Sequence, residues 1–397
     1  MKVCFVTQAF VRYPGDAIGS FVYRLGEKIA EDGVDVTVVA PHAQGLADTE
    51  QIGPLTVERF HYAPRHYERL AYQGTMHRAM QGNLLNKVIL ASFLVSFVAK
   101  TVRTVRRQKA DIIHAHWWFP SGFVGAIASA ITGVPLVVTC HGSDVGLLGK
   151  NRLVDAGARW VFGRAAAVTA VSDYLRARVV ESMPALSGRA VVVPMPVDQE
   201  FTRSAAAVRA PQAAPRTIIA AGRLSKQKGF HDLITAASIL AQRGVDFRLL
   251  LVGDGEEREA LKSLASCLRV QDRVEFLGTH TAGELATLFR AADVAVLPSY
   301  EEGLGLTLIE AMFCGTPVVG TRSGGICEVI ADGETGTLVS PGDTKALAQA
   351  LERVVTDTAY ARRLARAGQA YVRHHYDPRA SVNKTFSIYQ QVLHGHA

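Results

Sequence analysis

Short runs of apolar, β-branched residues alternate along the chain with longer stretches in which apolar residues recur every three to four positions. The short runs predict buried strands, and the longer stretches predict amphipathic helices. Strands that alternate with helices indicate parallel sheets covered on both faces. The strands expected in the first half are 2–7, 35–40, 111–116, 135–139, 167–170 and 190–193, and after residue 215 the pattern restarts with 217–221, 247–252, 274–277, 294–298 and 317–320.

Two successive sets of this kind predict an α/β protein with two doubly wound domains. The segment from Phe201 to Arg216 is rich in Ala, Pro and Arg and has no strand pattern, which indicates a linker. An amphipathic run after Pro378 predicts a helix that packs back on the first domain. The expected organisation is an N-terminal domain at 1–198, a linker at 199–215, a C-terminal domain at 216–376 and a C-terminal helix at 377–397.

Length and composition agree with this organisation. The chain has 397 residues, of which 48% are hydrophobic and 20% charged, as is typical of a well-packed globular protein of two domains. Its five cysteines include no C-x-x-C pair, so neither a disulfide framework nor a structural zinc site is expected. The first apolar run is too short for a signal peptide. A reducing, cytoplasmic location is the expectation.

Positive charge is concentrated in one segment. The net charge is +7, and residues 59–109 contain ten basic residues against the single acid Glu68. Such a cluster is typical of a surface that meets phosphate or an anionic membrane, although a solvated helix face is the alternative. The apolar run 88–99 within it is too short to span a bilayer; it is either a peripheral contact at the inner membrane face or an ordinary buried helix.

Glycines and cations follow the first strand of the second half. Gly222 and Arg223 come directly after this strand, and Lys228 and Gly229 precede a predicted helix. A glycine at a strand end lets backbone approach a ligand, and cations near a helix N-terminus suit a diphosphate. A plain strand-turn-helix connection is the alternative. The strand end Val252–Gly255 (VGDG) is a supporting signal only.

Two glutamates flank a glycine-containing loop later in the same half. Glu302 follows the strand 294–298, and Glu310 lies in the helix that begins near Leu306. Gly305 and Leu306 would present backbone N–H groups to phosphate oxygens. Ordinary surface glutamates are the alternative, but the glycines and the apolar helix argue against it.

The first half has a histidine at the carboxyl end of a strand, within the sequence His141-Gly142-Ser143-Asp144. His141 can hydrogen-bond a sugar hydroxyl or a leaving phosphate, and a buried structural histidine is the alternative. Upstream, Trp117 and Trp118 offer flat faces of the kind that sugars stack on.

Metal chemistry is not expected for the reaction. His114 and His116 share one strand face, but no third ligand is evident, so a structural or substrate-contact role is favoured. The chain contains no Asp-x-Asp triplet, the kind of paired carboxylate that holds a divalent cation. Charge on a leaving diphosphate would instead be neutralised by Arg223, Lys228 and helix N-termini, with no cofactor required.

Together these motifs resemble family 4 of the retaining glycosyltransferases, the glycosyltransferase group 1 enzymes, which have the GT-B fold of two Rossmann-like domains facing a central cleft. The matching pieces cover both halves, most densely between about 216 and 345. They are HGSD at 141–144, Gly-Arg and Lys-Gly within 222–229, VGDG at 252–255, Glu302 to Glu310, AMFCGTPVV at 311–319, and Gly324-Gly325 with Glu328.

The resemblance implies roles for these residues. Arg223 and Lys228 would bind the donor diphosphate together with backbone at Gly19, Gly305 and Leu306; Glu310 would hold the ribose; Glu302, Gly303 and Asp144 would contact the donor sugar; and His141 and Glu302 would be catalytic. Two departures stand out. The first loop has Ala17-Ile18-Gly19-Ser20 where the family often has Gly-Gly, and residues 195–196 are Met-Pro where Asn-Gly is common.

The resemblance implies a retaining hexosyltransferase that moves a sugar from a nucleotide-diphosphate donor, UDP by default, to an acceptor hydroxyl. We expect front-face substitution, in which the leaving phosphate helps to take the acceptor's proton. The basic N-terminal segment favours a lipid-linked or cell-surface polysaccharide precursor as acceptor. A small soluble acceptor, a nucleotide-sugar epimerase and a non-catalytic binder are the alternatives. A dehydrogenase is disfavoured because no G-x-G-x-x-G follows the first strand, and no nucleic-acid partner is expected.

Overall fold

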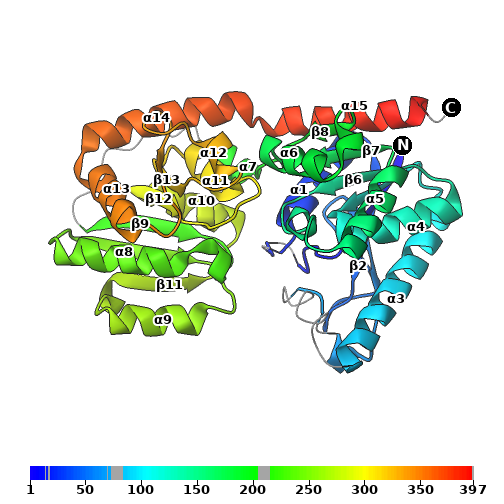
Figure 1. Cartoon of the computed structure of the whole chain (residues 1–397), viewed down its shortest axis with the longest axis horizontal. Helices are drawn as coiled ribbons and strands as arrows, with labels where there is room; N and C mark the ends of the chain where they lie inside the picture. Colours follow the sequence, from blue (N-terminus) through cyan, green and yellow to red (C-terminus); the bar gives the residue numbers. More distant parts are fainter. Residues whose placement is uncertain (14, 17, 69, 73–83, 204–214, 396–397) are drawn as a thin grey trace. The chain divides into compact units, whose positions relative to one another are not determined.

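The computed structural model describes residues 1–397 apart from 14, 17, 69, 73–83, 204–214 and 396–397. The described chain forms two compact units, the first made of Met1–Pro196 with Arg379–Ala397 and the second of Val197–Pro378. Each unit is a largely parallel sheet with helices on its faces (Figure 1). The predicted α/β class with two doubly wound sheets is confirmed.

The first unit is built on an eight-stranded sheet in the order β3-β4-β2-β1-β5-β6-β7-β8. Among the described residues of this sheet, only the β3–β4 pair is antiparallel. The strands are β1 (Lys2–Thr7), β2 (Asp35–Pro41), β3 (Thr49–Ile52), β4 (Leu55–Phe60), β5 (Ile112–His116), β6 (Leu136–Cys140), β7 (Ala167–Ala170) and β8 (Ala190–Val192). The α-helices are α1 (Ser20–Glu31), α3 (Leu84–Gln108), α4 (Phe123–Thr132), α5 (Arg152–Arg164), α6 (Asp173–Ser182) and α15 (Pro378–His394), with short turns η1 (Arg65–Tyr67), η2 (Trp118–Gly122), η3 (Val145–Leu147) and η4 (Pro184–Leu186).

The strand order reverses direction beside β1. Chain order leads outward from β1 to β2 and then returns to β5 on the other side of β1. Thr7 of β1 pairs with His116 of β5, and His116 pairs with Thr139 of β6, so the carboxyl ends of these three strands lie in line. This reversal is the position at which doubly wound sheets bind ligands.

The hairpin of β3 and β4 was not among the predicted strands. Strand β3 has the sequence TEQI, and only Ile52 is buried, so it lacks an apolar run. It is an edge strand that pairs with β4 alone. Polar edge strands are common because they discourage pairing with other chains, and this polarity hides them from a hydrophobicity pattern.

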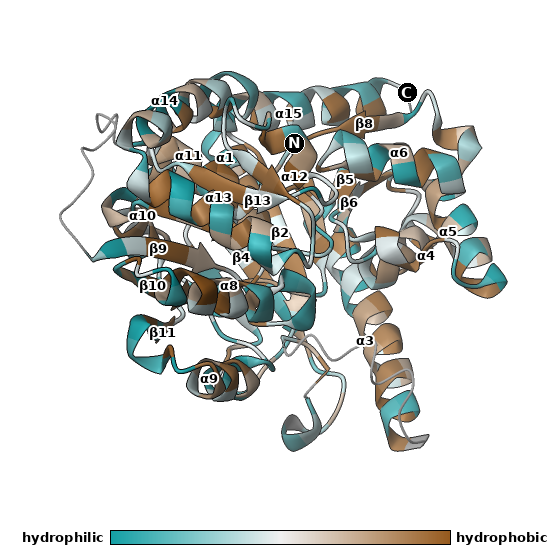
Figure 2. Cartoon of the chain, turned by 60° about the vertical axis from the view of Figure 1, so that its left-hand side comes forward, coloured by the Kyte–Doolittle hydropathy of each residue, from teal (hydrophilic) through white to brown (hydrophobic). Residues whose placement is uncertain are grey.

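Helix α3 is longer than the apolar run 88–99 suggested. It extends for 25 residues, and its segment Leu85–Gln108 is long and apolar enough to cross a membrane by length and composition, so the prediction of a stretch too short to span was wrong. Only 28% of its apolar window is buried. Phe93 and Phe97 are fully buried, whereas Val88 and Val95 are 57% and 69% exposed. Figure 2 shows hydrophobic residues along this helix.

The C-terminal helix α15 belongs to the first unit. The Tyr389 hydroxyl lies 2.6 Å from Nδ1 of His114, and Nε2 of His114 lies 2.6 Å from the Thr139 hydroxyl. All three side chains are buried. His114 therefore has a structural role, and it joins the last helix to the centre of the sheet.

The second unit has a six-stranded parallel sheet in the order β11-β10-β9-β12-β13-β14. Its strands are β9 (Arg216–Ala221), β10 (Phe247–Val252), β11 (Val274–Gly278), β12 (Val294–Leu297), β13 (Val318–Thr321) and β14 (Thr337–Val339). Its helices are α7 (Gln199–Thr202), α8 (Phe230–Gln242), α9 (Arg258–Cys267), α10 (Ala282–Ala291), α11 (Leu306–Phe313), α12 (Ile326–Val329), α13 (Thr344–Thr356) and α14 (Thr358–His375), with short turns η5 (Lys226–Lys228) and η6 (Gln271–Arg273).

Part of the predicted linker 199–215 is ordered. Asp198 caps α7 by accepting a hydrogen bond from the Glu200 backbone N–H at 3.0 Å. Phe201 is fully buried and its ring lies 6.1 Å from that of Phe289, so α7 is anchored in the second unit. Most of the remaining linker, 204–214, lies outside the described residues.

Candidate functional site

The second unit places its predicted site residues where its own sheet reverses direction. Strand β12 returns to pair with β9 after β10 and β11 have been added on the other side. Gly222 and Arg223 follow β9, and Glu302 lies in the loop after β12. The two adjacent carboxyl ends therefore bring together residues about eighty positions apart in the sequence, in the location that favours ligand binding.

The Lys228 ammonium forms an ion pair with the Glu302 carboxylate, with Nζ and Oε2 2.5 Å apart. Gly229 makes this approach possible: its φ is 66°, and a Cβ there would lie 2.1 Å from the Pro298 carbonyl oxygen. The backbone N–H of Tyr300 also donates to the Gln227 carbonyl at 2.9 Å. The two loops are thus held against each other by backbone, which fixes the cation beside the carboxylate.

Helix α11 begins at this loop. Its N-cap is Gly305, with φ 87° and no side-chain cap. The first backbone N–H groups of the helix, starting at Leu306, therefore face the loop without a capping side chain, as in anion sites at helix N-termini. Glu310 follows one turn later and is buried, with 6% of its surface exposed.

Arg223 is held by an acidic neighbour that the sequence patterns did not reveal. Its guanidinium donates to Glu256 Oε2 at 2.9 Å, and 45% of the Arg223 side chain is exposed. The backbone around it is supported by the VGDG turn, because Gly222 N–H donates to Val252 O at 2.9 Å and Leu224 N–H to Asp254 O at 3.0 Å. The VGDG turn thus shapes the loop that carries Arg223.

Gly303 is held by a neighbouring loop. The N–H of Gly325 donates to the Glu302 carbonyl at 2.9 Å. A Cβ on Gly325 would lie 2.3 Å from the Gly303 carbonyl oxygen. The Gly324-Gly325 pair therefore packs against the backbone of Glu302 and Gly303 and fixes the position of their loop.

In the first unit, His141 lies at the carboxyl end of β6 beside His116. Nε2 of His141 and Nδ1 of His116 are 3.1 Å apart. Burial, with a smaller effect from His114, lowers the pKa of His141 to about 3, and burial also lowers the pKa of His116 well below its usual value. Both rings are therefore neutral near pH 7, and one proton between these two nitrogens forms the hydrogen bond.

Asp144, which the resemblance assigns to the donor sugar, is buried and satisfied by backbone. Its Oδ1 accepts from the N–H groups of His141 and Gly142 at 3.1 and 2.9 Å, and its Oδ2 accepts from Trp118 N–H at 2.9 Å. Burial raises the pKa of Asp144 while these hydrogen bonds lower it. The geometry indicates a residue that positions the His141 turn.

The two tryptophans do not present the predicted stacking faces. Trp118 is 2% exposed, and its indole N–H donates to the Asp144 carbonyl at 2.7 Å, so its ring lies in the core. Trp117 is 8% exposed, and its ring centroid lies 4.6 Å from that of His141 and 5.7 Å from that of Phe21. Both tryptophan rings in the loop after β5 are therefore packed against neighbouring side chains or backbone. A pattern of residue types does not reveal such packing.

Gly19 lies at the N-terminus of α1 in the same neighbourhood. It has φ 71°, and a Cβ would lie 2.5 Å from the Ala9 carbonyl oxygen. Phe21 in the first turn of α1 contacts the His141 ring, with centroids 5.0 Å apart. Of the first-loop segment 17–20, residue 17 lies outside the described residues.

The structure therefore gathers the predicted residues into two groups, one in each unit. The group in the second unit consists of Arg223, Lys228, Glu302, Gly303, Gly305, Leu306 and Glu310, and the group in the first consists of Gly19, Trp117, Trp118, His141 and Asp144. Sequence reasoning missed Glu256 and Ser299, whose hydroxyl lies 3.3 Å from Glu302 Oε2. A signal for Ser299 existed, since it directly follows the strand that ends before Glu302.

Comparisons with known proteins cover both units. Residues 204–371 match the family described as "Glycosyl transferases group 1", and residues 16–196 match the "Glycosyl transferase 4-like domain". The chain is 35% identical over 290 residues to a D-inositol 3-phosphate glycosyltransferase of Pseudarthrobacter chlorophenolicus, an alignment that covers 68% of this chain and 69% of the relative.

Solved structures are similar over the whole length. A sucrose-phosphate synthase from Thermosynechococcus elongatus superposes with a TM-score of 0.82 at 25% identity, covering 100% of both chains. Anabaena HepE in complex with UDP-glucose superposes with a TM-score of 0.71 at 24% identity, covering 100% of this chain and 99% of HepE. The fold is therefore that of GT-B proteins.

Proposed function

The chain belongs to the group 1 glycosyltransferases, and on this basis we propose that it transfers a hexose from a UDP-sugar to an acceptor hydroxyl with retention of anomeric configuration. As a glycosyltransferase of this family it is a hexosyltransferase that uses a nucleotide sugar. The base, the stereochemical course and the acceptor are the parts proposed here. UDP-glucose held by HepE, which has a similar fold, supports UDP as the first donor to test.

The observation that carries the proposal is the placement of two cations and an uncapped helix N-terminus in the loops that follow the neighbouring strands β9 and β12 of the second unit. Arg223, Lys228 and the first N–H groups of α11 supply positive charge without a metal ion. Departure of the nucleoside diphosphate concentrates negative charge on its phosphates, and fixed donors stabilise that charge as it develops. This set of groups suits a leaving diphosphate.

Two glutamates would orient the rest of the donor. Glu310, buried one turn into α11, would accept hydrogen bonds from the ribose hydroxyls, and Glu302 would contact the donor sugar. The ion pair of Glu302 with Lys228 supports a binding role over a nucleophilic one, because the paired carboxylate is a weaker nucleophile. We therefore propose front-face substitution, with the leaving phosphate taking the acceptor proton; a kinetically competent covalent adduct on Glu302 would overturn it.

His141 would hydrogen-bond the donor sugar or the leaving group as a neutral imidazole. Burial lowers its pKa to about 3, so it does not contribute positive charge near pH 7. Charge stabilisation would therefore come from Arg223 and Lys228, whereas His141 would contribute orientation.

The donor is tested by binding and slow hydrolysis of UDP-, GDP- and ADP-sugars, with and without EDTA. We expect one donor to bind in an EDTA-insensitive manner and Glu310→Ala to weaken that binding about 10- to 100-fold, the value of hydrogen bonds to a charged group. Glu259→Ala, at a side chain 81% exposed on α9, is the matched control. Failure of every nucleotide sugar to bind would refute the donor proposal.

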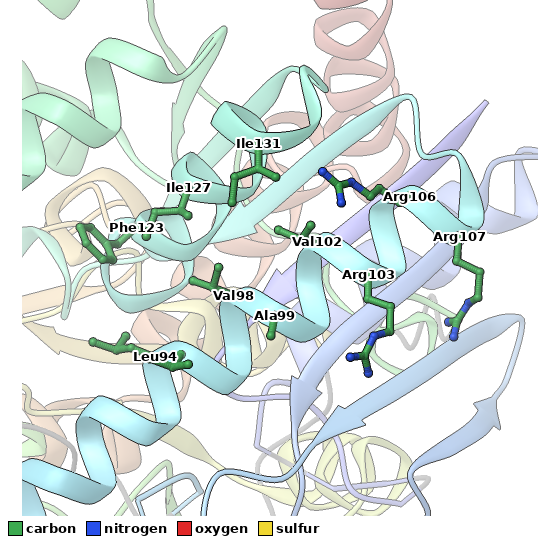
Figure 3. A pocket seen from close by; sticks show the side chains of 11 residues that line it. Leu94, Val98, Ala99, Val102, Arg103, Arg106, Arg107, Phe123, Ile127 and Ile131 are labelled. Atoms are coloured by element: carbon green, nitrogen blue, oxygen red, sulfur yellow. The ribbon is translucent and has the colours of Figure 1, made fainter.

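For the acceptor we propose a lipid-linked or cell-surface polysaccharide precursor reached from an anionic membrane surface. A groove of about 950 Å³ runs between α3 and α4 (Figure 3). Apolar side chains of both helices line it, and arginines stand at one end. The lining residues are Leu94, Val95, Val98, Ala99, Val102, Arg103, Arg106, Arg107, Phe123, Ile127 and Ile131.

Not every basic residue of the segment 59–109 is available to bind an anionic surface. Arg59 is buried at 2% exposure and donates to Glu50, so it is not part of any surface patch. Lys100 and Arg107 pair with the buried Glu58. Arg103 and Arg106 are exposed beside the groove and form no ion pair with a described residue. Residues 69 and 78 of the predicted basic segment lie outside the described part of the chain.

Vesicle sedimentation tests this acceptor proposal. Binding should rise with the fraction of anionic phospholipid and fall with salt, because the attraction is partly electrostatic. Arg103→Glu with Arg106→Glu should reduce the partition coefficient at least tenfold, at about 1 kcal/mol for each basic residue near the surface. Lys150→Glu, at an exposed loop of the same unit, is the control. Binding independent of anionic lipid would instead favour a small soluble acceptor.

Product analysis separates the remaining alternatives. A transferase consumes donor faster when its acceptor is present, whereas an epimerase converts the donor without one. A D-inositol 3-phosphate glycosyltransferase is among the relatives, so soluble polyol phosphates belong in the acceptor panel.

A further inference from the structure

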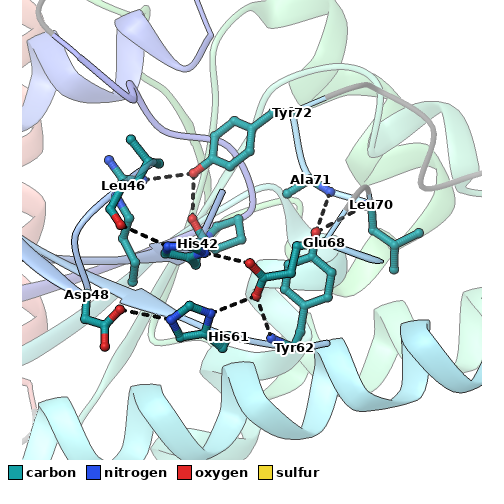
Figure 4. Close-up of polar contacts among 11 residues, drawn as sticks. His42, Leu46, Asp48, His61, Tyr62, Glu68, Leu70, Ala71 and Tyr72 are labelled. Atoms are coloured by element: carbon teal, nitrogen blue, oxygen red, sulfur yellow. Dashed lines mark hydrogen bonds and ion pairs between the residues drawn. The ribbon is translucent and has the colours of Figure 1, made fainter. Parts of the chain in front are cut away.

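A cluster of two histidines and a glutamate lies at the edge of the first unit's sheet, apart from the residues assigned to sugar transfer. His42 follows β2 and His61 follows β4, and these strands are parallel neighbours in which Pro41 pairs with Phe60. The register therefore sets the two imidazoles side by side, with ring centroids 3.9 Å apart. Glu68, in the segment after η1, reaches both rings (Figure 4).

The outer nitrogen of each ring faces an oxygen that accepts a hydrogen bond. Nε2 of His42 lies 2.9 Å from the Leu46 carbonyl oxygen, which can only accept. Nε2 of His61 lies 2.9 Å from Oδ1 of Asp48, a carboxylate that also accepts. A neutral ring carries one proton, so a ring that donates from Nε2 to these acceptors presents a lone pair at Nδ1.

The inner atoms of the cluster are then all electron-pair donors facing one another. Nδ1 of His42 lies 2.6 Å from Glu68 Oε2, and Nδ1 of His61 lies 3.0 Å from Glu68 Oε1. The three ligand atoms lie within 4.8 Å of one another. The His42 and Glu68 side chains are 1% and 0% exposed, so water does not relieve their repulsion. Such an arrangement requires either additional protons or one cation.

From this geometry we propose that His42, His61 and Glu68 form a binding site for a divalent transition-metal ion of the Zn²⁺ class. Two imidazole nitrogens and one carboxylate are a ligand set that suits Zn²⁺, with a fourth position for water. Leu46 and Asp48 orient the histidines, as outer hydrogen-bond partners do in zinc sites. The N–H of Tyr62 donates to Glu68 Oε1 at 3.3 Å and orients the carboxylate in the same way.

The bound ion would fasten the segment after β4 to the sheet. Glu68 and the Tyr62 hydroxyl, which accepts from the N–H groups of Leu70 and Ala71 at 3.2 and 3.4 Å, already connect this segment to β4. A metal bridge between Glu68 and both strand ends would add a bond to β2. The site would be structural and separate from the residues of the second unit that are proposed to bind the nucleotide sugar. The transfer reaction would therefore still need no metal.

The test uses the full-length protein with Zn²⁺ and with Co²⁺, a spectroscopic substitute. After treatment with chelator, wild type should bind one equivalent of Co²⁺ with the intense visible absorption of a low-coordinate site, and Zn²⁺ should displace it. His42→Gln and His61→Gln should each weaken Zn²⁺ binding at least tenfold, and Asp48→Asn about 10- to 100-fold. His66→Gln, at an exposed histidine of η1, should have no effect.

A second measurement does not depend on variants. Zn²⁺ should slow hydrogen exchange at the amides of Tyr62, Leu70 and Ala71 in wild type, because it closes the segment over the strand ends. If Co²⁺ gives no band, or if His42→Gln and His66→Gln bind Zn²⁺ equally, the site does not exist and the cluster holds protons instead. Donor hydrolysis serves as the separate readout for the transferase proposal, because it should survive His61→Gln.

Discussion

Nδ1 of the buried His116 lies 3.1 Å from Nε2 of the partly buried His141. The other ring nitrogen of His116, Nε2, is buried and has no hydrogen-bond partner among the described residues. The inner histidine therefore has one polar contact, and that contact orients the ring proposed to face the donor. His116 is thus a positioning residue for His141.

Removal of this contact should lower turnover more than donor affinity. We expect His116→Phe to decrease kcat about 10- to 100-fold with little change in the donor KM, because His141 loses its fixed tautomer and orientation. Steady-state kinetics with the identified donor measures this split. A rise in KM at unchanged kcat would contradict the positioning role.

The neighbouring histidine provides the contrast. His114→Phe leaves the buried Tyr389 hydroxyl without its partner, at a cost of about 1–3 kcal/mol in the unfolding free energy, whereas the Thr139 hydroxyl keeps its 2.6 Å contact with the Thr169 hydroxyl. Thermal and urea unfolding should therefore show a destabilised His114→Phe, with kcat close to that of the wild type. Equal losses of kcat in both variants would show that the two histidines act as one unit.

The Lys228–Glu302 ion pair should show energetic coupling in donor binding. Lys228→Met alone should weaken donor binding about 10- to 100-fold, since it removes a cation from the diphosphate and leaves the Glu302 carboxylate unpaired. In a double-mutant cycle with Glu302→Gln, the coupling should be about 0.5–3 kcal/mol. The measurement is donor affinity by calorimetry. Strict additivity would mean that the two side chains act independently on the donor.

Gly325→Ala tests whether backbone packing fixes the position of the loop that carries Glu302. The φ of Gly325 is −65°, which any residue adopts, so the penalty is steric: a Cβ would lie 2.3 Å from the Gly303 carbonyl oxygen and 2.7 Å from Leu304 Cα. We expect a loss of about 1–3 kcal/mol in stability and a weaker donor affinity. Gly157→Ala, where a Cβ meets nothing within 4 Å, is the control and should be neutral or stabilising.

Acid should destabilise the first unit through His114 and His141, whose pKa values are lowered. His114 and His141 have folded-state pKa values lowered to about 3, chiefly by burial, while the unfolded chain has a value near 6.5. Between these values the unfolded state binds more protons, so stability is fully present above pH 6.5 and is lost as the pH falls toward 3. Each histidine contributes up to about 1.4 kcal/mol per pH unit.

Urea unfolding between pH 7 and pH 4 measures this slope. His114→Phe should reduce the change of unfolding free energy with pH by the contribution of one histidine, even though this variant is less stable than wild type at pH 7. By the same reasoning, the pH–rate profile should show no inflection from His141 between pH 5.5 and 8. An unchanged slope in His114→Phe would show that His114 takes up its proton at the same pH in the folded and the unfolded protein.

The sequence by itself determined the class of fold, and it named most of the residues that are proposed for the donor site in the second unit. Buried parallel strands such as Val294–Leu297 are continuous apolar runs, and the residues proposed to bind the donor lie in the loops after such strands, so period and position in the chain were enough. Lys228 and Glu302 could be proposed for one ligand because the carboxyl ends of parallel strands share an edge. The family resemblance then supplied their roles.

Only the tertiary structure decided what depends on neighbours distant in the chain. The sequence predicts a surface charge at Arg59, but this side chain is buried and donates to Glu50. It predicts a stacking face for sugars at Trp118, but this indole is buried and donates to the Asp144 carbonyl. His42 and His61 show no metal-ligand spacing, because the pairing of β2 with a strand that the pattern missed brings them together. Burial and hydrogen-bond partners are properties of packing, and a single sequence records residue types without the distances between them.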